Sequence, residues 1–290
     1  MKKTEFQKRM KLYEEKESER KFLPLLPIMA RLDGRSFHSF CRGLRKPFSP
    51  AFSGLMVEVT KYLVAETGAL MGYTQSDEIS LVWLSEEFEK KTFFEGRIFK
   101  VTSVLAGLAT AKFNQLLPDY LPEKKKALPV FDCRVWQVPN KTEAANGFLW
   151  RQFDATRNSI TGLARCHFSH AEIHGKDSRE MLNMLLDKGI SWSSLPPAFT
   201  HGVWLQRQKN VRPYTTEEID KLPLKHKART DPNLQVVRWA IIPIVIPLSF
   251  SFVTNREGVI FSGEMPRFIP ELLPMDENGV LKRRTEKWET

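Results

Sequence analysis

The chain has 290 residues, of which 42% are hydrophobic, enough to bury a core without covalent cross-links. Its 44 Lys and Arg against 34 Asp and Glu give a net charge of +10, which favours a polyanionic partner such as a nucleic acid. The three scattered cysteines are too few for a disulfide framework, so we expect a cytoplasmic protein. The longest apolar run, 239–250, is too short to span a bilayer and contains prolines, which predicts a soluble protein with no membrane partner.

The first part of the chain predicts a charged N-terminal segment, a buried strand and a helix. Residues 1–21 are amphipathic and lack the continuous apolar core of a signal peptide. The apolar run that follows ends in Asp33-Gly34, which indicates a strand that stops at a sharp turn with Asp33 exposed at its end. Ser49 and Pro50 then mark the start of an amphipathic helix, because Ser is a favoured N-cap and Pro fits the first turn.

The stretch 72–83 contains two adjacent carboxylates, Asp77 and Glu78. Apolar side chains lead into them and then alternate in the loose period-2 pattern that is typical of a strand. This pattern predicts a hairpin with both carboxylates at or just beyond its tip. Two neighbouring anions repel each other, so a fold tolerates them best beside a cation. The hairpin therefore predicts a site for a divalent metal.

A second helix is predicted from Phe94 to Leu117, and a further strand from Leu128 to Val138. The order within 22–138 is then strand, helix, strand, strand, helix, strand. We expect an α+β fold built on this ferredoxin-like unit, as in the palm of polymerases and nucleotide cyclases. In such a sheet the first strand lies beside the hairpin, so Asp33 and Asp77 would meet over one pair of metal ions.

Helical and extended patterns continue after residue 139. Helices are predicted at 142–168 and 178–188, and strands at 201–208 and 235–246, joined by a basic connection at 210–233. We expect four segments: an N-terminal segment at 1–21, a palm-like catalytic core at 22–138, an extension of helices and strands packed on the core at 139–250, and a partly flexible C-terminal segment at 251–290.

Several motifs occur in the order that is known from one enzyme family. They are Arg31-Leu32-Asp33-Gly34-Arg35-Ser36-Phe37, Lys46-Pro47, Gln75-Ser76-Asp77-Glu78, Phe131-Asp132-Cys133-Arg134-Val135 and Trp150-Arg151-Gln152-Phe153-Asp154. Over roughly residues 6–205 the chain resembles the tRNA(His) guanylyltransferase family, whose members add nucleotides to RNA in the 3′-to-5′ direction. A series of motifs in order is far more specific than any single motif.

The resemblance implies a set of site residues and ligands. It implies two Mg²⁺ ions held by Asp33, Asp77 and the backbone carbonyl of Gly34, with Glu78 as a further catalytic residue. It implies that ATP, GTP or other nucleoside triphosphates bind, and that tRNA is the partner of a homotetramer. The implied triphosphate-binding residues are Arg31, Lys46, Ser76, Arg97, Lys100 and Asn158, and the implied RNA-binding residues are Arg151 and Arg157.

One departure from the family bears on the substrate. Eukaryotic enzymes that act on histidine tRNA carry His-Ile-Asn-Asn-Leu-Tyr-Asn at a point where this chain has Thr156-Arg157-Asn158-Ser159-Ile160-Thr161-Gly162. The difference favours the bacterial-type relatives, which repair 5′-truncated tRNAs by template-directed addition after ATP activates the 5′ phosphate. The alternatives are guanine addition to histidine tRNA, an RNA-binding module without catalysis, and a cyclase-like enzyme that joins nucleotides without RNA.

Overall fold

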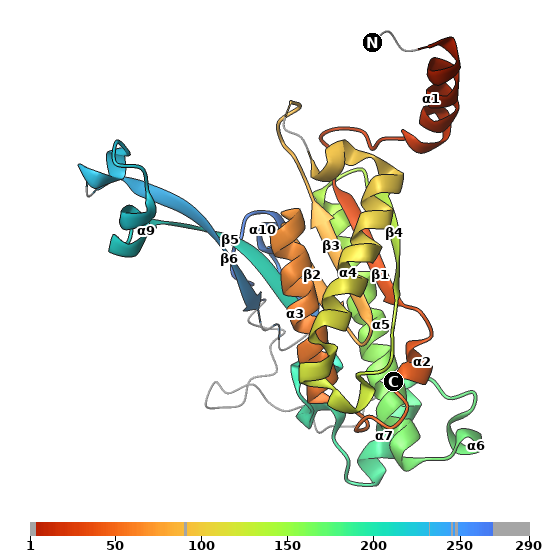
Figure 1. The fold of residues 1–290 in the computed structure, drawn as a ribbon. Coiled ribbons are helices and arrows are strands. Elements are labelled where there is room, and N and C mark those ends of the chain that lie inside the picture. Colours follow the sequence, from red (N-terminus) through yellow and green to blue (C-terminus); the bar gives the residue numbers. More distant parts are fainter. Residues whose placement is uncertain (1–3, 90–91, 232, 245, 247–248, 269–290) are drawn as a thin grey trace.

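The computed structural model describes residues 4–89, 92–231, 233–244, 246 and 249–268, and it is built around one antiparallel sheet (Figure 1). The six strands lie in the order β4-β1-β3-β2-β5-β6. They are β1 (Ile28–Gly34), β2 (Met71–Gln75), β3 (Glu78–Trp83), β4 (Phe131–Gln137), β5 (Val203–Pro213) and β6 (Gln235–Ile244). The first four strands alternate with two long helices in the order that was predicted for residues 22–138.

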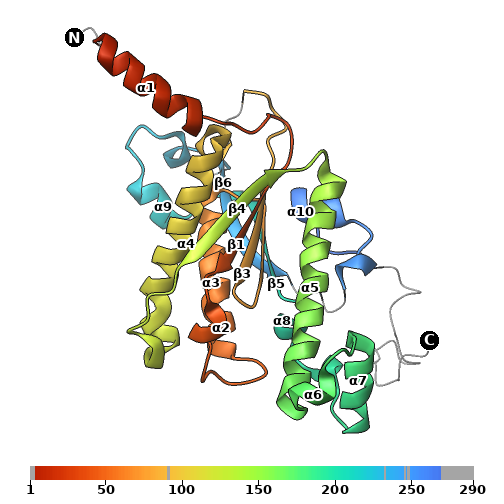
Figure 2. The same ribbon diagram turned by 90° about the vertical axis from the view of Figure 1, so that its right-hand side faces the viewer.

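Helices form a layer on each face of this sheet. The α-helices of the described residues are α1 (Glu5–Ser18), α2 (Phe37–Phe40), α3 (Pro50–Thr67), α4 (Ile98–Tyr120), α5 (Lys141–His167), α6 (His170–Ile173), α7 (Ser178–Asp187), α8 (Pro197–Thr200), α9 (Thr216–Lys221) and α10 (Arg256–Phe261). Helices α3 and α4 cover one face, and α5 with α10 covers the other (Figure 2). None of the helices in the described ranges is long and apolar enough to cross a membrane.

The central strands are buried on both faces because successive side chains alternate between the two layers. Leu32, Ile79 and Leu81 pack with α3 and α4, whereas Met29 and Val82 pack with α5. Every residue of β3 is buried. This packing fixes the register of β1 against β3, because a slip of one residue would exchange the two faces.

Helix α3 has the ends that the sequence predicted. The Ser49 side chain accepts a hydrogen bond from the backbone N–H of Phe52 at 3.3 Å, and Pro50 is the first helical residue. The helix ends at Gly68, whose φ of +69° is costly for any residue with a Cβ. These local signals position the chain between β1 and β2.

Four predicted boundaries were wrong. Helix α4 begins at Ile98 and not at Phe94, because Phe94 and Glu95 have positive φ and form a turn before it. It continues through Pro118, since a proline in the last turn removes only one backbone hydrogen bond. Strand β4 begins at Phe131, and β5 continues to Pro213 as a partner of β6.

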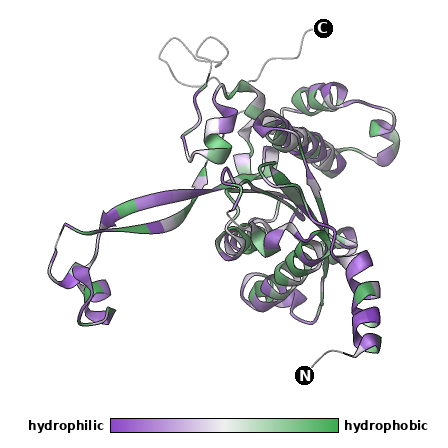
Figure 3. Ribbon diagram, turned by 90° about the horizontal axis from the view of Figure 1, so that it is seen from above, coloured by the Kyte–Doolittle hydropathy of each residue, from purple (hydrophilic) through white to green (hydrophobic). Residues whose placement is uncertain are grey.

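Strands β5 and β6 extend beyond the sheet as a two-stranded ribbon. Figures 1 and 3 show that the ribbon projects from the body and carries α9 at its tip. Helix α1, which has no buried residue, also stands apart. The flexibility expected of the C-terminal segment concerns mainly residues 269–290, which lie outside the described residues.

Candidate active site

A group of carboxylates lies where the central strands β1 and β3 meet one end of the sheet. Asp33, near the end of β1, is directly opposite Glu78 on β3 and Asp132 on β4. Directly opposed residues of antiparallel strands place their side chains on the same face, which here is the face covered by α5. Asp77 lies in the turn that joins β2 to β3, so the predicted meeting of Asp33 and Asp77 is observed.

The carboxylates line a cavity of about 250 Å³. Its walls are Arg31, Asp33, Gln75, Ser76, Asp77, Glu78, Arg134, Arg151, Asp154 and Asn158. Burial raises the pKa of Asp33 and of Asp77, and the charge of Asp132 adds to the rise at Asp33. The Ser76 hydroxyl donates to Asp77 Oδ1 at 3.0 Å and partly offsets the rise in its pKa. Burial is thus the main influence on both carboxylates, and Arg31, Arg134 and Arg151 act in the opposite direction on the pKa of Asp33.

The oxygen ligands in this cavity fit Mg²⁺ better than a metal that needs a full protein cage. No group of three or more His, Cys, Asp or Glu side chains suited to a metal occurs among the described residues. Asp33 and Asp77 supply two carboxylates, and the Gly34 carbonyl follows Asp33 directly. Magnesium in phosphoryl-transfer sites is commonly held by one or two carboxylates together with substrate phosphates. These residues fit that pattern.

Glu78 is engaged by an arginine that the sequence did not pair with it. Arg151 Nε donates to Glu78 Oε1 at 2.7 Å and Arg151 Nη2 donates to Oε2 at 2.6 Å. The two side chains are only 8% and 7% exposed, and Arg151 also binds Asp154 at 2.8 Å. A carboxylate with both oxygens in a bidentate pair is poorly placed to bind a metal as well. Glu78 is thus placed to orient its neighbours and Arg151 is buried beside it, while the catalytic role expected of Glu78 and the RNA contact expected of Arg151 stay predictions.

Asp154 was not among the predicted site residues, although it belongs to a matching motif. It accepts hydrogen bonds from Arg151 and Arg157, and Asn158 Nδ2 lies 3.4 Å from its Oδ2. Arg157 remains 66% exposed, so it can still reach a ligand outside the cavity. The spacing of residues 151, 154 and 158 in the sequence already indicates that they share one face of a helix.

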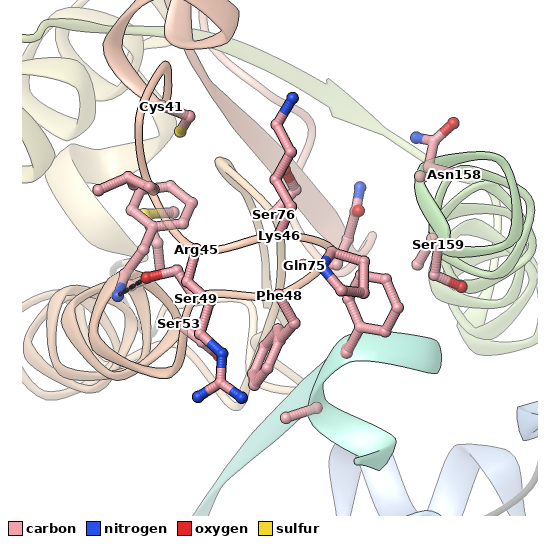
Figure 4. Close-up of a pocket in the computed structure, with 18 of the residues that line it drawn as sticks. Cys41, Arg45, Lys46, Phe48, Ser49, Ser53, Gln75, Ser76, Asn158 and Ser159 are labelled. Carbon is pink, nitrogen blue, oxygen red and sulfur yellow. Dashed lines mark hydrogen bonds between the residues drawn. The ribbon is translucent and has the colours of Figure 1, made fainter. Parts of the chain in front are cut away.

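A second cavity of about 280 Å³ adjoins the first, with Gln75, Ser76 and Asn158 in both walls. Figure 4 shows Lys46 and Ser76 above Phe48 in this cavity. Its lining is largely apolar, and the rings of Phe48 and Phe199 lie 5.5 Å apart. An apolar cavity beside a charged one matches the two halves of a nucleotide.

Arg97 and Lys100 do not reach this site within one chain. The backbone of Arg97 forms an isolated β-bridge with the backbone of Lys21, which precedes β1. Lys100 Nζ lies 5.0 Å from the centroid of the Phe94 ring. Strand β3 starts at the carboxylates and α4 follows its far end, so the start of α4 is about 20 Å away, roughly the length of this six-residue strand. The periodicity showed that the two cations share a helix face but not at which end of the sheet they lie.

The chain resembles several known proteins. Residues 7–139 match the family model described as tRNAHis guanylyltransferase. A protein of Acanthamoeba polyphaga mimivirus is 30% identical over 69% of this chain and 76% of its own length. The tRNA(His) guanylyltransferase of Schizosaccharomyces pombe is 28% identical over 64% of this chain and 76% of its own length.

Solved structures give the same result. A bacterial tRNA(His) guanylyltransferase-like protein in complex with ATP has a TM-score of 0.65 and 35% identity, over 69% of this chain and 86% of that one. A second such structure, in complex with GTP, has a TM-score of 0.62 and 28% identity, over 82% of this chain and 91% of that one. The chain therefore belongs to the tRNA(His) guanylyltransferase family, whose members are nucleotidyltransferases that act on tRNA.

Proposed function

We propose that this chain adds nucleotides to the 5′ end of truncated tRNA in a template-directed manner, with residues 22–138 serving as a polymerase-like palm. The observation that carries the proposal is the pair Asp33 and Asp77 in a charged cavity that opens onto an apolar cavity of nucleotide size. The order β4-β1-β3-β2 supports the palm, because it is the order of a ferredoxin-like sheet.

Asp33, Asp77 and the Gly34 carbonyl would hold two Mg²⁺ ions. When bound, such ions polarise phosphoryl oxygens and lower the pKa of an attacking hydroxyl. The protein's own contribution is to keep both carboxylates at the end of two paired strands, where burial disfavours their charge in the absence of a cation. Glu78 and Arg151 support this position by joining β3 to α5.

In this proposal each cavity holds one part of the nucleotide. Ser76 and Asn158 line both cavities, Lys46 lines the apolar one and Arg31 the charged one, and these four residues would bind the triphosphate. The base would lie against Phe48 and Phe199 in the apolar cavity. The ATP and GTP complexes of the bacterial relatives support binding of either purine nucleotide.

The substrate assignment rests on the sequence of α5. The family's histidine-tRNA motif is replaced by residues 156–162, which favours repair of truncated tRNAs over dedicated addition of guanosine.

We further propose that the active enzyme is a homotetramer, which would allow Arg97 and Lys100 of one subunit to serve the site of another.

The test is incubation of the purified protein with Mg²⁺, ATP, each nucleoside triphosphate and a labelled tRNA that lacks its first nucleotide. We expect addition only of the nucleotide complementary to the opposing base. The variants Asp33→Asn and Asp77→Asn should lose at least about 10³-fold in rate, since each removes a metal ligand, and should still fold because the amide is isosteric. Asp119→Asn, at an exposed position of α4, is the matched control. Full activity of either site variant would refute the proposal, and addition only to full-length histidine tRNA would establish the narrower activity.

A further inference from the structure

Two aromatic side chains of α5, the helix that carries Arg151, are about half exposed. Trp150 is 54% exposed and Phe153 is 53% exposed. They lie three residues apart on α5 and so share one side of the helix, and we call this pair the aromatic shelf. Neighbouring residues of the same helix, Phe148 and Gln152, are fully buried. Neither ring of the shelf belongs to a hydrophobic core cluster of the described residues.

The shelf is close to the reacting centre. Arg31 Cζ lies 5.5 Å from the Trp150 ring, and Arg151 Cζ lies 4.5 Å from it. Arg31 precedes Asp33 by two residues on β1, so their side chains leave the same face about 7 Å apart. The path from the Trp150 ring through Arg31 to Asp33 is therefore about 12 Å, so a group stacked on Trp150 would lie near the carboxylates.

Exposed arginines lie around the shelf, of which Arg134 is 4.0 Å from Asp132 and Arg157 pairs with Asp154. Arg134 lies opposite Arg31 in the register of β4 with β1, and its side chain is 61% exposed. Arg157, one turn along α5 from Phe153, is 66% exposed. Flat aromatic rings flanked by arginines suit a ligand that has both planar faces and negative charge, which is the chemistry of a nucleic-acid strand. A purely apolar ligand would not need these cations.

We propose that Trp150 stacks against a nucleobase at the 5′ end of the RNA substrate, that Phe153 extends this stacking surface, and that Arg134 contacts a phosphate beside it. The inference rests on the proposed function and names the protein groups that hold the RNA end. Stacking is tolerant of sequence, because every base has a π face. The shelf would hold the 5′ end of many tRNAs in place, and base pairing would choose the incoming nucleotide.

The experiment measures stacking separately from catalysis. A truncated tRNA carries the fluorescent base 2-aminopurine as its first remaining 5′ nucleotide, and its emission is recorded at saturating protein without nucleoside triphosphate. The variants are Trp150→Leu, which removes the ring, and Trp150→Phe, which keeps an aromatic face. Trp239→Leu is the matched control, because Trp239 is 50% exposed and has Arg207 Cζ 4.0 Å from its ring, but lies on the distant ribbon.

We expect the wild-type protein and Trp239→Leu to quench the emission, Trp150→Leu to lose most of the quenching, and Trp150→Phe to recover it. In the addition assay Trp150→Leu should raise KM for RNA about tenfold and leave KM for ATP unchanged. A raised KM for ATP with intact quenching would overturn the inference, because it would mean that Trp150 only orients Arg31. Equal quenching by wild type and Trp150→Leu would overturn it as well. The fluorescence result is independent of nucleotide addition, so failure of the proposed function would be seen separately in the activity assay.

Discussion

At the residue scale, the site residues occupy positions that oppose their own charge. Asp33 and Asp77 are partly buried with other carboxylates nearby, and burial is the largest cause of the rise in both pKa values. Arg151 differs from these carboxylates, because the bidentate hydrogen bonds to Glu78 compensate the cost of burying its positive charge. Shifted carboxylate pKa values of this kind are typical of functional sites, and here they coincide with the place where we propose that cations bind.

His201 gives a prediction at the same scale. Burial lowers its pKa from 6.5 to about 4, so between these pH values the unfolded chain binds a proton that the folded protein does not. The free energy of unfolding should therefore fall as the pH is lowered from 6.5 to 4, by up to about 3 kcal/mol from this residue. Urea unfolding of the wild type and of His201→Gln across this range should show a shallower pH dependence in the variant. The exposed His167→Gln is the control, and an unchanged slope in His201→Gln would contradict the assignment.

At the scale of elements, the pair Glu78 and Arg151 joins the central strand β3 to helix α5. We expect Glu78→Gln to lower the free energy of unfolding by about 2–4 kcal/mol, because it leaves a buried guanidinium with weaker compensation. The double variant Glu78→Gln/Arg151→Met should be less destabilised than the sum of the single variants, since it removes both charges. The exposed pair Lys61 and Glu58 supplies the control, and Glu58→Gln should change stability by no more than about 0.5 kcal/mol. Additive effects at positions 78 and 151 would show that the pair contributes no coupling.

The same scale shows what could be predicted from the sequence. Strand β1, helix α3 and the β2-β3 hairpin were predictable because apolar runs, the Ser49 cap and the turn at Asp77 act locally. Asp33 and Asp77 could be assigned to one site because both lie at strand ends that the strand order brings together. The pairing of Glu78 with Arg151 could not be predicted, because it depends on how α5 packs on the sheet. The length of β5 was also missed, because its polar second half is held by backbone pairing with β6.

At the scale of the whole molecule, the basic balance and the projecting elements point to a large polyanionic ligand. The ribbon of β5 and β6 presents Lys209 and the half-exposed Val211 and Val237 away from the core. Helix α1 buries no residue of its own against the rest of the chain. A nucleotide in the cavities near Ser76 would not contact these outlying surfaces, so they are free to contact a larger ligand or another subunit.

The net charge of +10 leads to a prediction about salt. If tRNA binding neutralises six or more phosphates, its Kd should rise by about 10³-fold or more between 50 and 200 mM salt, because binding releases counterions from the RNA. Binding of ATP should change far less over the same range, since only one triphosphate is held. Fluorescence titration of both ligands at four salt concentrations gives the two slopes. Equal slopes for tRNA and ATP would mean that the RNA contacts the protein only near the nucleotide cavities, and that the basic surface elsewhere does not contribute to RNA binding.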